Sequence, residues 1–329
     1  MGNIYPYIDL HSDTLYQAWR CGAKDIFQLK GSMADVKAAL AGGCKLQVYA
    51  IFMPDLDEIN DSTVYYPGDD LYIQRLSEIF THTAQVYKDV FAPALSIKDA
   101  DCNAAEGKVS GMLSMEDGRA VRGSFERISA FYDLGIRILG LTWNHPNCFG
   151  YPNSSDPAEM AKGLTVFGKE ALSCMEDLGM LVDVSHLSDS CFWDVAQICK
   201  RPFLASHSNC RALNPHPRSM TDEMIRALAD HGGIMGLNFC PAFLTKDLQS
   251  TCSTVDAMAY QLRHRINVGG LGCAAIGTDF DGIGGNLEVP SAAQMQTMFD
   301  ELEKRGFSSH EIEQISHKNA ERLLSEVLG

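Results

Sequence analysis

The stretch Tyr7-Ile8-Asp9-Leu10-His11-Ser12-Asp13 starts as an apolar run and ends in a histidine and a carboxylate two positions apart. Seven more short apolar runs follow it along the chain, and most of them also end in polar residues. With Tyr7–Leu10 as the first, the runs are Leu46–Phe52, Gly111–Met115, Ile138–Leu141, Leu181–Val184, Phe203–Ala205, Ile234–Leu237 and Ala274–Ile276. Short apolar runs of this kind are typical of buried strands in a parallel sheet.

Longer amphipathic stretches separate the runs and predict helices. They are Met33–Ala41, Asp70–Val90, Phe125–Leu134, Leu164–Leu178, Ser188–Cys199, Thr221–Asp230 and Val255–Val268, with Ala292–Arg305 and Ser309–Val327 after the last run. Eight strand–helix repeats predict an α/β fold, a (β/α)8 TIM barrel of the metal-dependent hydrolase type. A doubly wound open sheet is the alternative, but no GxGxxG or GxxxxGK[ST] motif follows the first run. No linker divides the chain, so we expect one barrel domain over residues 1–329.

Composition narrows the possible partners. Asp and Glu outnumber Lys and Arg by 42 to 27, and a net charge of −15 argues against a nucleic-acid surface. No window approaches the roughly 18 apolar residues of a membrane span, and the N-terminus has no basic, apolar leader. The eleven cysteines include no CxxC pair, which favours reduced thiols in a cytoplasmic protein.

The residues that follow the runs are the candidate site. They include His11-Ser12-Asp13 after the first run, Glu116 after the third, Thr142-Trp143-Asn144-His145 after the fourth, His186 after the fifth, His207 after the sixth and Asp279 after the eighth. In a barrel, the carboxyl ends of all strands meet at one mouth, where active sites form. Imidazole and carboxylate are ligands for zinc and similar divalent metals.

The pattern predicts two metal ions. Residues i and i+2 of a strand point to one side, so His11 and Asp13 are expected to reach one ion. His186 and His207 leave adjacent strands and suit a second ion, with the two oxygens of Glu116 available as a bridge. Each residue alone has a simpler interpretation: Asp13 as a helix cap, Glu116 as a solvated acid, and each histidine as a hydrogen-bonding loop residue.

Two further features point to the substrate. Arg211 and Arg218 stand in the polar loop after the sixth run, and either could bind a carboxylate through two hydrogen bonds. The alternative is a surface ion pair with Asp222 or Glu223. Asp279 stands beside the proposed metals and suits a proton shuttle, although it could instead cap the loop that follows. The segment 54–69 is expected to line the mouth.

At this point the chain resembles the membrane dipeptidase (renal dipeptidase) family, peptidase family M19. The resemblance runs from Ile8 to the last helix and rests on separated motifs in a fixed order. They are Asp9-Leu10-His11-Ser12-Asp13-Thr14-Leu15, Ser114-Met115-Glu116-Asp117-Gly118, Leu141-Thr142-Trp143-Asn144-His145, Asp183-Val184-Ser185-His186, the Ser206–Arg218 loop and Gly277-Thr278-Asp279-Phe280-Asp281-Gly282-Ile283.

The resemblance implies a zinc-dependent dipeptidase with two Zn2+ per chain in a binuclear centre. His11 and Asp13 would bind one zinc, His186 and His207 the other, and Glu116 would bridge them. His145 would contact the scissile carbonyl, Arg218 the substrate's α-carboxylate, and Asp279 would carry the proton of the water that the metals activate. Family members cleave dipeptides, often accept a D-residue at the second position, and often form homodimers.

The chain departs from the family in two respects. Asp117 stands where relatives often have Gly, and neither the signal peptide nor the lipid-anchor tail of mammalian members is evident. The soluble microbial type is therefore the better analogue. Two rival hypotheses are a different amidohydrolase, acting on a cyclic amide or a base, and a binding protein without activity. His-x-Asp in place of His-x-His counts against the first, and the complete ligand set counts against the second.

Overall fold

A computed structural model describes residues 4–55, 59 and 65–329. Within these residues, eight parallel strands close into a barrel in the order β1-β2-β4-β5-β6-β7-β8-β10, with β10 paired to β1. The strands are β1 Tyr7–Ser12, β2 Cys44–Phe52, β4 Val109–Glu116, β5 Ile136–Gly140, β6 Leu181–Asp183, β7 Leu204–Ser208, β8 Ile234–Leu237 and β10 Ala274–Ile276. This confirms the predicted (β/α)8 barrel, and each of the eight apolar runs overlaps one barrel strand.

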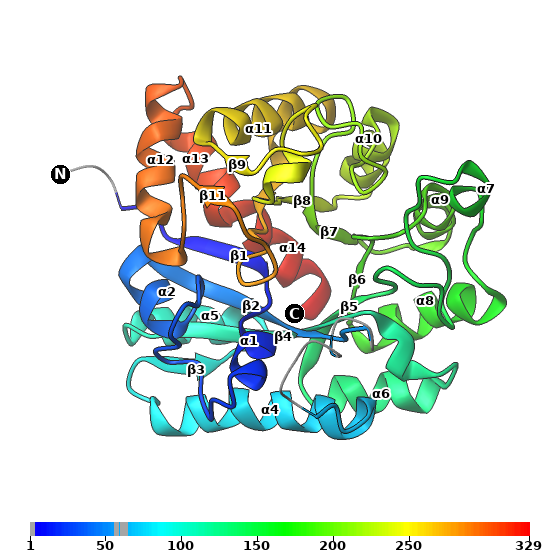
Figure 1. Cartoon of the computed structure of the whole chain (residues 1–329), viewed down its shortest axis with the longest axis horizontal. Helices are drawn as coiled ribbons and strands as arrows, with labels where there is room; N and C mark the ends of the chain where they lie inside the picture. The colour runs from blue at the N-terminus through cyan, green and yellow to red at the C-terminus, as the bar shows by residue number, and fades with distance from the viewer. Residues whose placement is uncertain (1–3, 56–58, 60–64) are drawn as a thin grey trace.

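Helices surround the strands and follow one another around them in chain order, as the colour gradient in Figure 1 shows. Those that the sequence predicted are α2 Val36–Gly42, α4 Asp69–Val86, α6 Phe125–Asp133, α8 Val166–Leu178, α9 Asp189–Ile198, α10 Asp222–Asp230, α11 Val255–Gly269, α12 Met295–Lys304, α13 Ser309–Glu313 and α14 Asn319–Leu328. Two of these helices begin at side-chain caps: Ser188 accepts a hydrogen bond from Cys191 N, and Thr221 accepts one from Met224 N.

Several shorter elements were not predicted. They are α1 Thr14–Arg20, β3 Phe91–Pro93, α5 Ile97–Ala105, α7 Pro157–Met160, the strand pair β9 Cys252–Ser253 and β11 Asn286–Leu287, and 3-10 turns at Gly118–Val121, Pro241–Phe243, Leu271–Cys273 and Ala292–Gln294. The predicted helix Ser309–Val327 is interrupted by a π-helical turn at Gln314–Lys318, and α4 ends at Val86 rather than Val90. Helix α1 follows β1 after Asp13 alone, without a side-chain cap, so the usual signal for a helix start is missing.

The two ends of the barrel differ in polarity. Apolar residues from all eight strands form a buried cluster with Leu323, Leu324 and Val327 of α14. Three of these strand residues, Leu181, Leu204 and Ile234, are the first of their strands, so the cluster closes the amino end. The histidine and carboxylate side chains that follow the strands lie at the carboxyl end. No helix in the described part of the chain is long and apolar enough to cross a membrane.

Candidate metal centre and active site

The five predicted metal ligands come together at the carboxyl end of the barrel. Four of them are buried and His186 is partly buried, and within each of three overlapping groups the ligand atoms lie within 4.8 Å of one another. The groups are His11, Asp13 and Glu116; Glu116, His186 and His207; and His11, His207 and Asp279. The structure therefore places in one cluster residues that are nearly 200 positions apart in the sequence.

Glu116, the last residue of β4, lies in the middle of the cluster with one carboxylate oxygen on each side. Its Oε2 is 3.4 Å from His11 Nε2. Its Oε1 is 3.0 Å from His186 Nε2 and 3.5 Å from His207 Nε2. A carboxylate that presents a different oxygen to each of two ligand groups has the arrangement of a bridging ligand.

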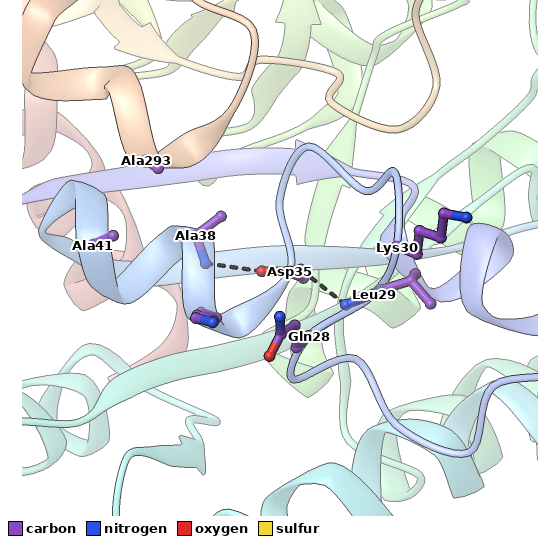
Figure 2. Close-up of a pocket in the computed structure, with 8 residues that line it drawn as sticks. Gln28, Leu29, Lys30, Asp35, Ala38, Ala41 and Ala293 are labelled. Atoms are coloured by element: carbon purple, nitrogen blue, oxygen red, sulfur yellow. Dashed lines mark hydrogen bonds between the residues drawn. The ribbon is translucent and has the colours of Figure 1, made fainter.

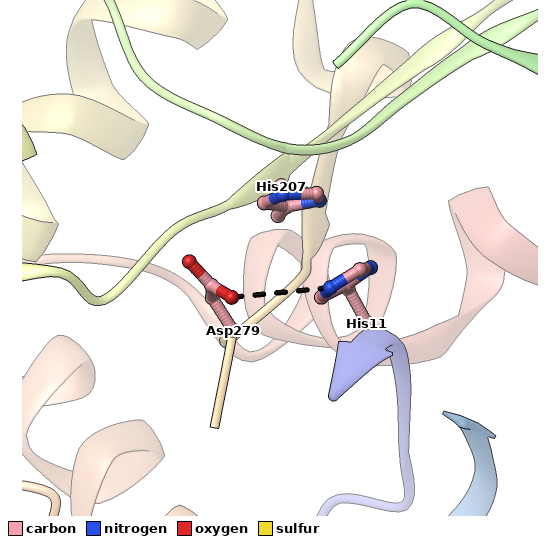
Figure 3. Close-up of side chains that lie close together, drawn as sticks. All are labelled: His11, His207 and Asp279. Carbon is pink, nitrogen blue, oxygen red and sulfur yellow. Dashed lines mark ion pairs between the residues drawn. The ribbon is translucent and has the colours of Figure 1, made fainter. Parts of the chain in front are cut away.

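The histidine rings pack closely at the boundary between the two groups. The rings of His11 and His207 stack with centroids 3.8 Å apart, and His186 Nε2 lies 3.1 Å from His207 Nε2. Figure 3 shows Asp279 beside this stack, with its carboxylate toward His11; Asp279 Oδ1 is 3.9 Å from His11 Nε2. The nitrogens and the carboxylate oxygens thus face a common space.

The buried carboxylates of the cluster favour a positive charge among them. Burial disfavours a charged imidazole, but the carboxylates of Glu116 and Asp13 outweigh it and raise the pKa of His11 well above its usual value. Burial raises the pKa of Asp13 to about 6 and that of Asp279 to about 7, and nearby carboxylates add to both shifts. A cation held among these acids would relieve their mutual repulsion.

The donor set fits a divalent metal. Burial lowers the pKa of His186 to about 4 and that of His207 well below its usual value, so both rings are neutral near pH 7, as metal ligands must be. Their contacts with Glu116 are therefore not ion pairs. His11 Nε2 and Asp13 Oδ1 are buried without a hydrogen-bond partner among the described residues, and buried polar atoms in that condition need an explanation. Metal ligation supplies one.

The route by which Asp13 reaches the cluster differs from the one expected. Strand β1 ends at Ser12, and its pairing with β2 shifts register between Asp9 and Ser12, so simple alternation does not place Asp13. Its backbone N–H instead donates to Phe280 O at 2.9 Å. The side chain does not cap α1, which removes the alternative interpretation, and Asp13 Oδ2 lies 3.7 Å from His11 Nε2.

Backbone strain gathers around the site. Asp117, His186, Asp279 and Asp281 all have φ between 64° and 74°, a region that costs non-glycine residues about 1–3 kcal/mol and recurs at functional sites. Asp281 is held by hydrogen bonds from Thr14 Oγ1, Ser32 Oγ and Met33 N, each 2.6 Å long. These bonds tie the loop that carries Asp279 to the start of the chain.

Gly282 leaves room for two of the carboxylates. A Cβ at this position would lie 2.1 Å from Asp13 Oδ2 and 2.7 Å from Asp279 Oδ1, whereas a Cβ at Gly284 would meet nothing within 4 Å. We therefore expect Gly282→Ala to displace these carboxylates and weaken metal binding about 10-fold or more. Gly284→Ala is the matched control and should bind as the wild type does. Equal affinity of the two variants in a competition titration with a chelator would show that Asp13 does not hold the metal.

A cavity of about 610 Å3 opens onto the cluster. Its lining includes the polar residues Asp13, Glu116, His186 and Asp279 and the aromatic residues Tyr16, Phe52, Trp143 and Phe243. Phe52 makes edge-to-face contacts with Tyr16 and Trp143, at centroid distances of 5.2 and 4.7 Å. The cavity therefore offers both polar groups and an apolar surface for a side chain.

Of the two candidate arginines, Arg218 lines this cavity. It is 6% exposed, and it donates to Ser208 Oγ and His207 O, while its Nε–H has no partner in the described structure. Arg211 instead makes two 2.7 Å bonds to Asp189, not to the predicted Asp222 or Glu223. Arg218 is thus the arginine placed to bind an anionic group.

His145 is not part of the cluster. Its side chain is 68% exposed, its Nε2 lies 2.9 Å from Asp55 Oδ2, and it is not among the cavity-lining residues. Trp143, two positions earlier, lines the cavity and lies 6.3 Å from His186 between ring centroids. The predicted contact of His145 with the substrate carbonyl stays a prediction that this arrangement does not favour. Residues 56–58 and 60–64 of the segment expected to line the mouth lie outside the described residues.

One residue of the site, Asn238, was not singled out from the sequence, and Asp117 was noted only as a departure from the family. Asn238 follows β8 directly and donates through Nδ2 to Asp279 Oδ2 at 2.9 Å, so the strand-end pattern applied to the seventh run finds it. Asp117 accepts a 2.6 Å bond from Asn147 Nδ2, and that amide also donates to Leu141 O. Because Asp117 directly follows Glu116, its bond with Asn147 ties the loop after β5 to the end of β4.

A second hollow, of about 500 Å3, lies beside α2 and serves as a contrast (Figure 2). Its buried acid, Asp35, accepts hydrogen bonds from Ala38 N and Leu29 N and so caps the helix. The remaining lining residues are chiefly alanines and exposed polar chains. The buried acid of this hollow therefore serves as a helix cap, in contrast to the carboxylates at the barrel mouth.

Comparison with known proteins identifies the family of the chain. A model of the membrane dipeptidase family (peptidase family M19) matches residues 3–328. An uncharacterised protein of Klebsiella pneumoniae is 32% identical over 79% of this chain and 98% of its own, and dipeptidase aclJ of Aspergillus oryzae is 28% identical over 98% and 78%. A metallo peptidase from Rhodobacter sphaeroides, solved with a phosphinate mimic of the dipeptide L-Ala-D-Ala, shares the fold at TM-score 0.89, with 23% identity over 99% and 100% of the two chains.

Proposed function

The chain belongs to the membrane dipeptidase family, a family of metal-dependent enzymes that hydrolyse dipeptides, and on that premise we propose a binuclear zinc site that accepts a D-residue at the C-terminal position. One observation carries the two-metal part of this proposal. Glu116 presents Oε2 to His11 and Oε1 to His186 and His207, which gives each of two ions an imidazole and a shared carboxylate. Asp13 completes the first group.

Two zinc ions held by His11, Asp13, Glu116, His186 and His207 would lower the pKa of a water and polarise the scissile carbonyl. The residues of the chain do the rest. Asp279, fixed through Oδ2 by Asn238, takes the proton of the attacking water on its other oxygen and delivers it to the leaving amine. Its buried position among carboxylates favours a base of near-neutral pKa, the value at which a proton carrier works best near pH 7.

Arg218 selects the length of the substrate in this proposal. Its unpartnered Nε–H and the cavity position suit a bidentate contact with the α-carboxylate. A free carboxylate at a fixed distance from the metals admits a dipeptide and excludes longer chains. The second side chain then lies against the aromatic residues that line the cavity, outside the reacting bond, so that either configuration is accepted. The mimic bound to the Rhodobacter protein has an L-D configuration, which supports this part of the proposal.

A substrate panel tests the proposal. The purified zinc-loaded protein is offered L-Ala-L-Ala, L-Ala-D-Ala, the amide of L-Ala-D-Ala and tri-alanine. We expect turnover of both dipeptides, with kcat/KM reduced at least about 30-fold for the amide, because it removes one partner of a buried charge pair. Cleavage of tri-alanine as fast as dipeptides would contradict the length-measuring role of Arg218, and turnover of L-Ala-L-Ala alone would remove the proposed D-residue tolerance.

Three further properties remain predictions: one barrel domain over residues 1–329, a homodimer, and a cytoplasmic location. The family match favours dipeptide hydrolysis over the rival amidohydrolase and binding-protein hypotheses.

A further inference from the structure

A chain of hydrogen bonds behind His207 leads away from the proposed metals to a buried carboxylate. His207 Nδ1 lies 2.7 Å from Ser206 Oγ, and Ser206 Oγ donates in turn to Asp183 Oδ2. All three side chains are nearly or fully buried, with Asp183 5% exposed and the other two 1%. The proposed reaction uses neither Asp183 nor Ser206.

The direction of these bonds follows from a count of protons. A serine hydroxyl has one proton, and the carboxylate of Asp183 can only accept, so the proton of Ser206 points at Asp183. The contact with His207 must then be a bond from Nδ1–H to the lone pair of Ser206 Oγ. A neutral imidazole protonated at Nδ1 has its lone pair at Nε2, the atom that faces Glu116 and His186.

The carboxylate is itself held in place. Asp183 Oδ1 accepts from the backbone N–H groups of Ser185 and Ser206, both at 2.9 Å. Ser185 Oγ accepts from His207 N at 3.2 Å. The other histidine of this group lacks such support, because His186 Nδ1 is buried without a partner among the described residues. The arrangement is therefore particular to His207.

We propose that Asp183 and Ser206 are positioning residues that hold the proton of His207 on Nδ1, so that Nε2 is presented to the metal as a lone-pair donor. Partners of this kind orient metal-binding histidines, and their loss typically weakens metal binding 10- to 100-fold. The inference rests on the proposed metal site for its purpose, but the tautomer itself is a property of the metal-free protein.

Asp183→Asn reverses the direction of the hydrogen bonds between His207, Ser206 and residue 183, with little change in the shape of the side chain. The asparagine Oδ1 keeps the two backbone hydrogen bonds, and its Nδ2 takes the place of Oδ2 and donates to Ser206 Oγ. The proton of Ser206 then turns toward His207 Nδ1, which favours the tautomer protonated at Nε2. That tautomer has no lone pair on Nε2, the nitrogen that faces the proposed metal site. We expect binding of one of the two zinc ions to weaken 10- to 100-fold in this variant.

Two readouts test the inference. Nitrogen-15 spectra of the histidine rings in the metal-free protein report which nitrogen of His207 carries the proton, and a zinc titration against a competing chelator reports affinity. The wild type is expected to show His207 protonated at Nδ1, and Asp183→Asn to show it at Nε2. An Nε2–H tautomer in the wild type, or an unchanged tautomer in the variant, overturns the proposal. A wild type that binds no zinc but shows the Nδ1–H tautomer refutes the proposed function and not this inference.

A second pair of variants decides the matter if Asp183→Asn does not fold. Ser206→Thr keeps the hydroxyl and should keep zinc affinity, whereas Ser206→Ala removes it and should lose affinity to the same extent as Asp183→Asn. The chain offers a matched control, since Ser316 Oγ makes a similar 2.9 Å contact with the Nδ1 of His317, outside the cluster. Ser316→Ala should leave zinc binding unchanged. Equal affinity of Ser206→Ala and Ser206→Thr contradicts the proposal.

Discussion

Replacement of Asp279 by asparagine is expected to lower kcat for dipeptides by about 10²–10⁴-fold, the usual contribution of a positioned proton carrier, while both metal ions are retained. The amide cannot take a proton from water, but its oxygen can still accept the hydrogen bond from Asn238. Steady-state kinetics and metal analysis of the same preparation check the two halves of this expectation.

Asp133→Asn is a suitable control for Asp279→Asn, because Asp133 is an exposed acid at the end of α6 and should have no effect on turnover. Loss of a metal ion together with activity in Asp279→Asn would make Asp279 a ligand. Full activity with both metals present would remove its role in proton transfer.

Replacement of Arg218 by methionine is expected to raise KM steeply for dipeptides. Methionine keeps an unbranched apolar stem but loses the guanidinium, and the substrate carboxylate would face a buried site without a partner. Truncation of one partner of a buried charge pair costs about 2–5 kcal/mol, which corresponds to a loss of at least about 30-fold in kcat/KM.

Arg211→Met is the matched control for Arg218→Met. Arg211 belongs to the same loop but pairs with Asp189 and does not line the cavity, so its loss should leave KM unchanged. A KM change in Arg211→Met and not in Arg218→Met would assign the carboxylate contact to the other arginine.

The barrel was predictable from the sequence because its strands are buried on both faces. Strands such as β4, in which every residue is buried, appear in the sequence as short apolar runs. The missed elements lack that signal. β3 has three residues, of which only Phe91 is buried. Helix α1 begins at Thr14, with only Asp13 between it and the end of β1.

The cluster of proposed metal ligands was predictable for a related reason: parallel strands bring their carboxyl ends to one mouth, so residues that follow the runs meet. What the sequence does not show is the direction of side chains within a loop. His145 and Trp143 are two positions apart, and only the structure shows that the tryptophan lines the cavity while the histidine pairs with Asp55. The direction of the hydrogen bonds from His207 to Asp183 also requires coordinates.

The central claim is a dipeptidase that needs two metal ions held by the cluster around Glu116. The most direct measurement is the turnover of L-Ala-D-Ala by chelator-treated protein during stepwise addition of zinc, with bound zinc counted at each step. The account predicts that turnover is absent without metal, reaches its plateau at two zinc ions per chain, and does not recover in Glu116→Ala. Full turnover in the metal-free protein, or a plateau at one ion per chain, would contradict it.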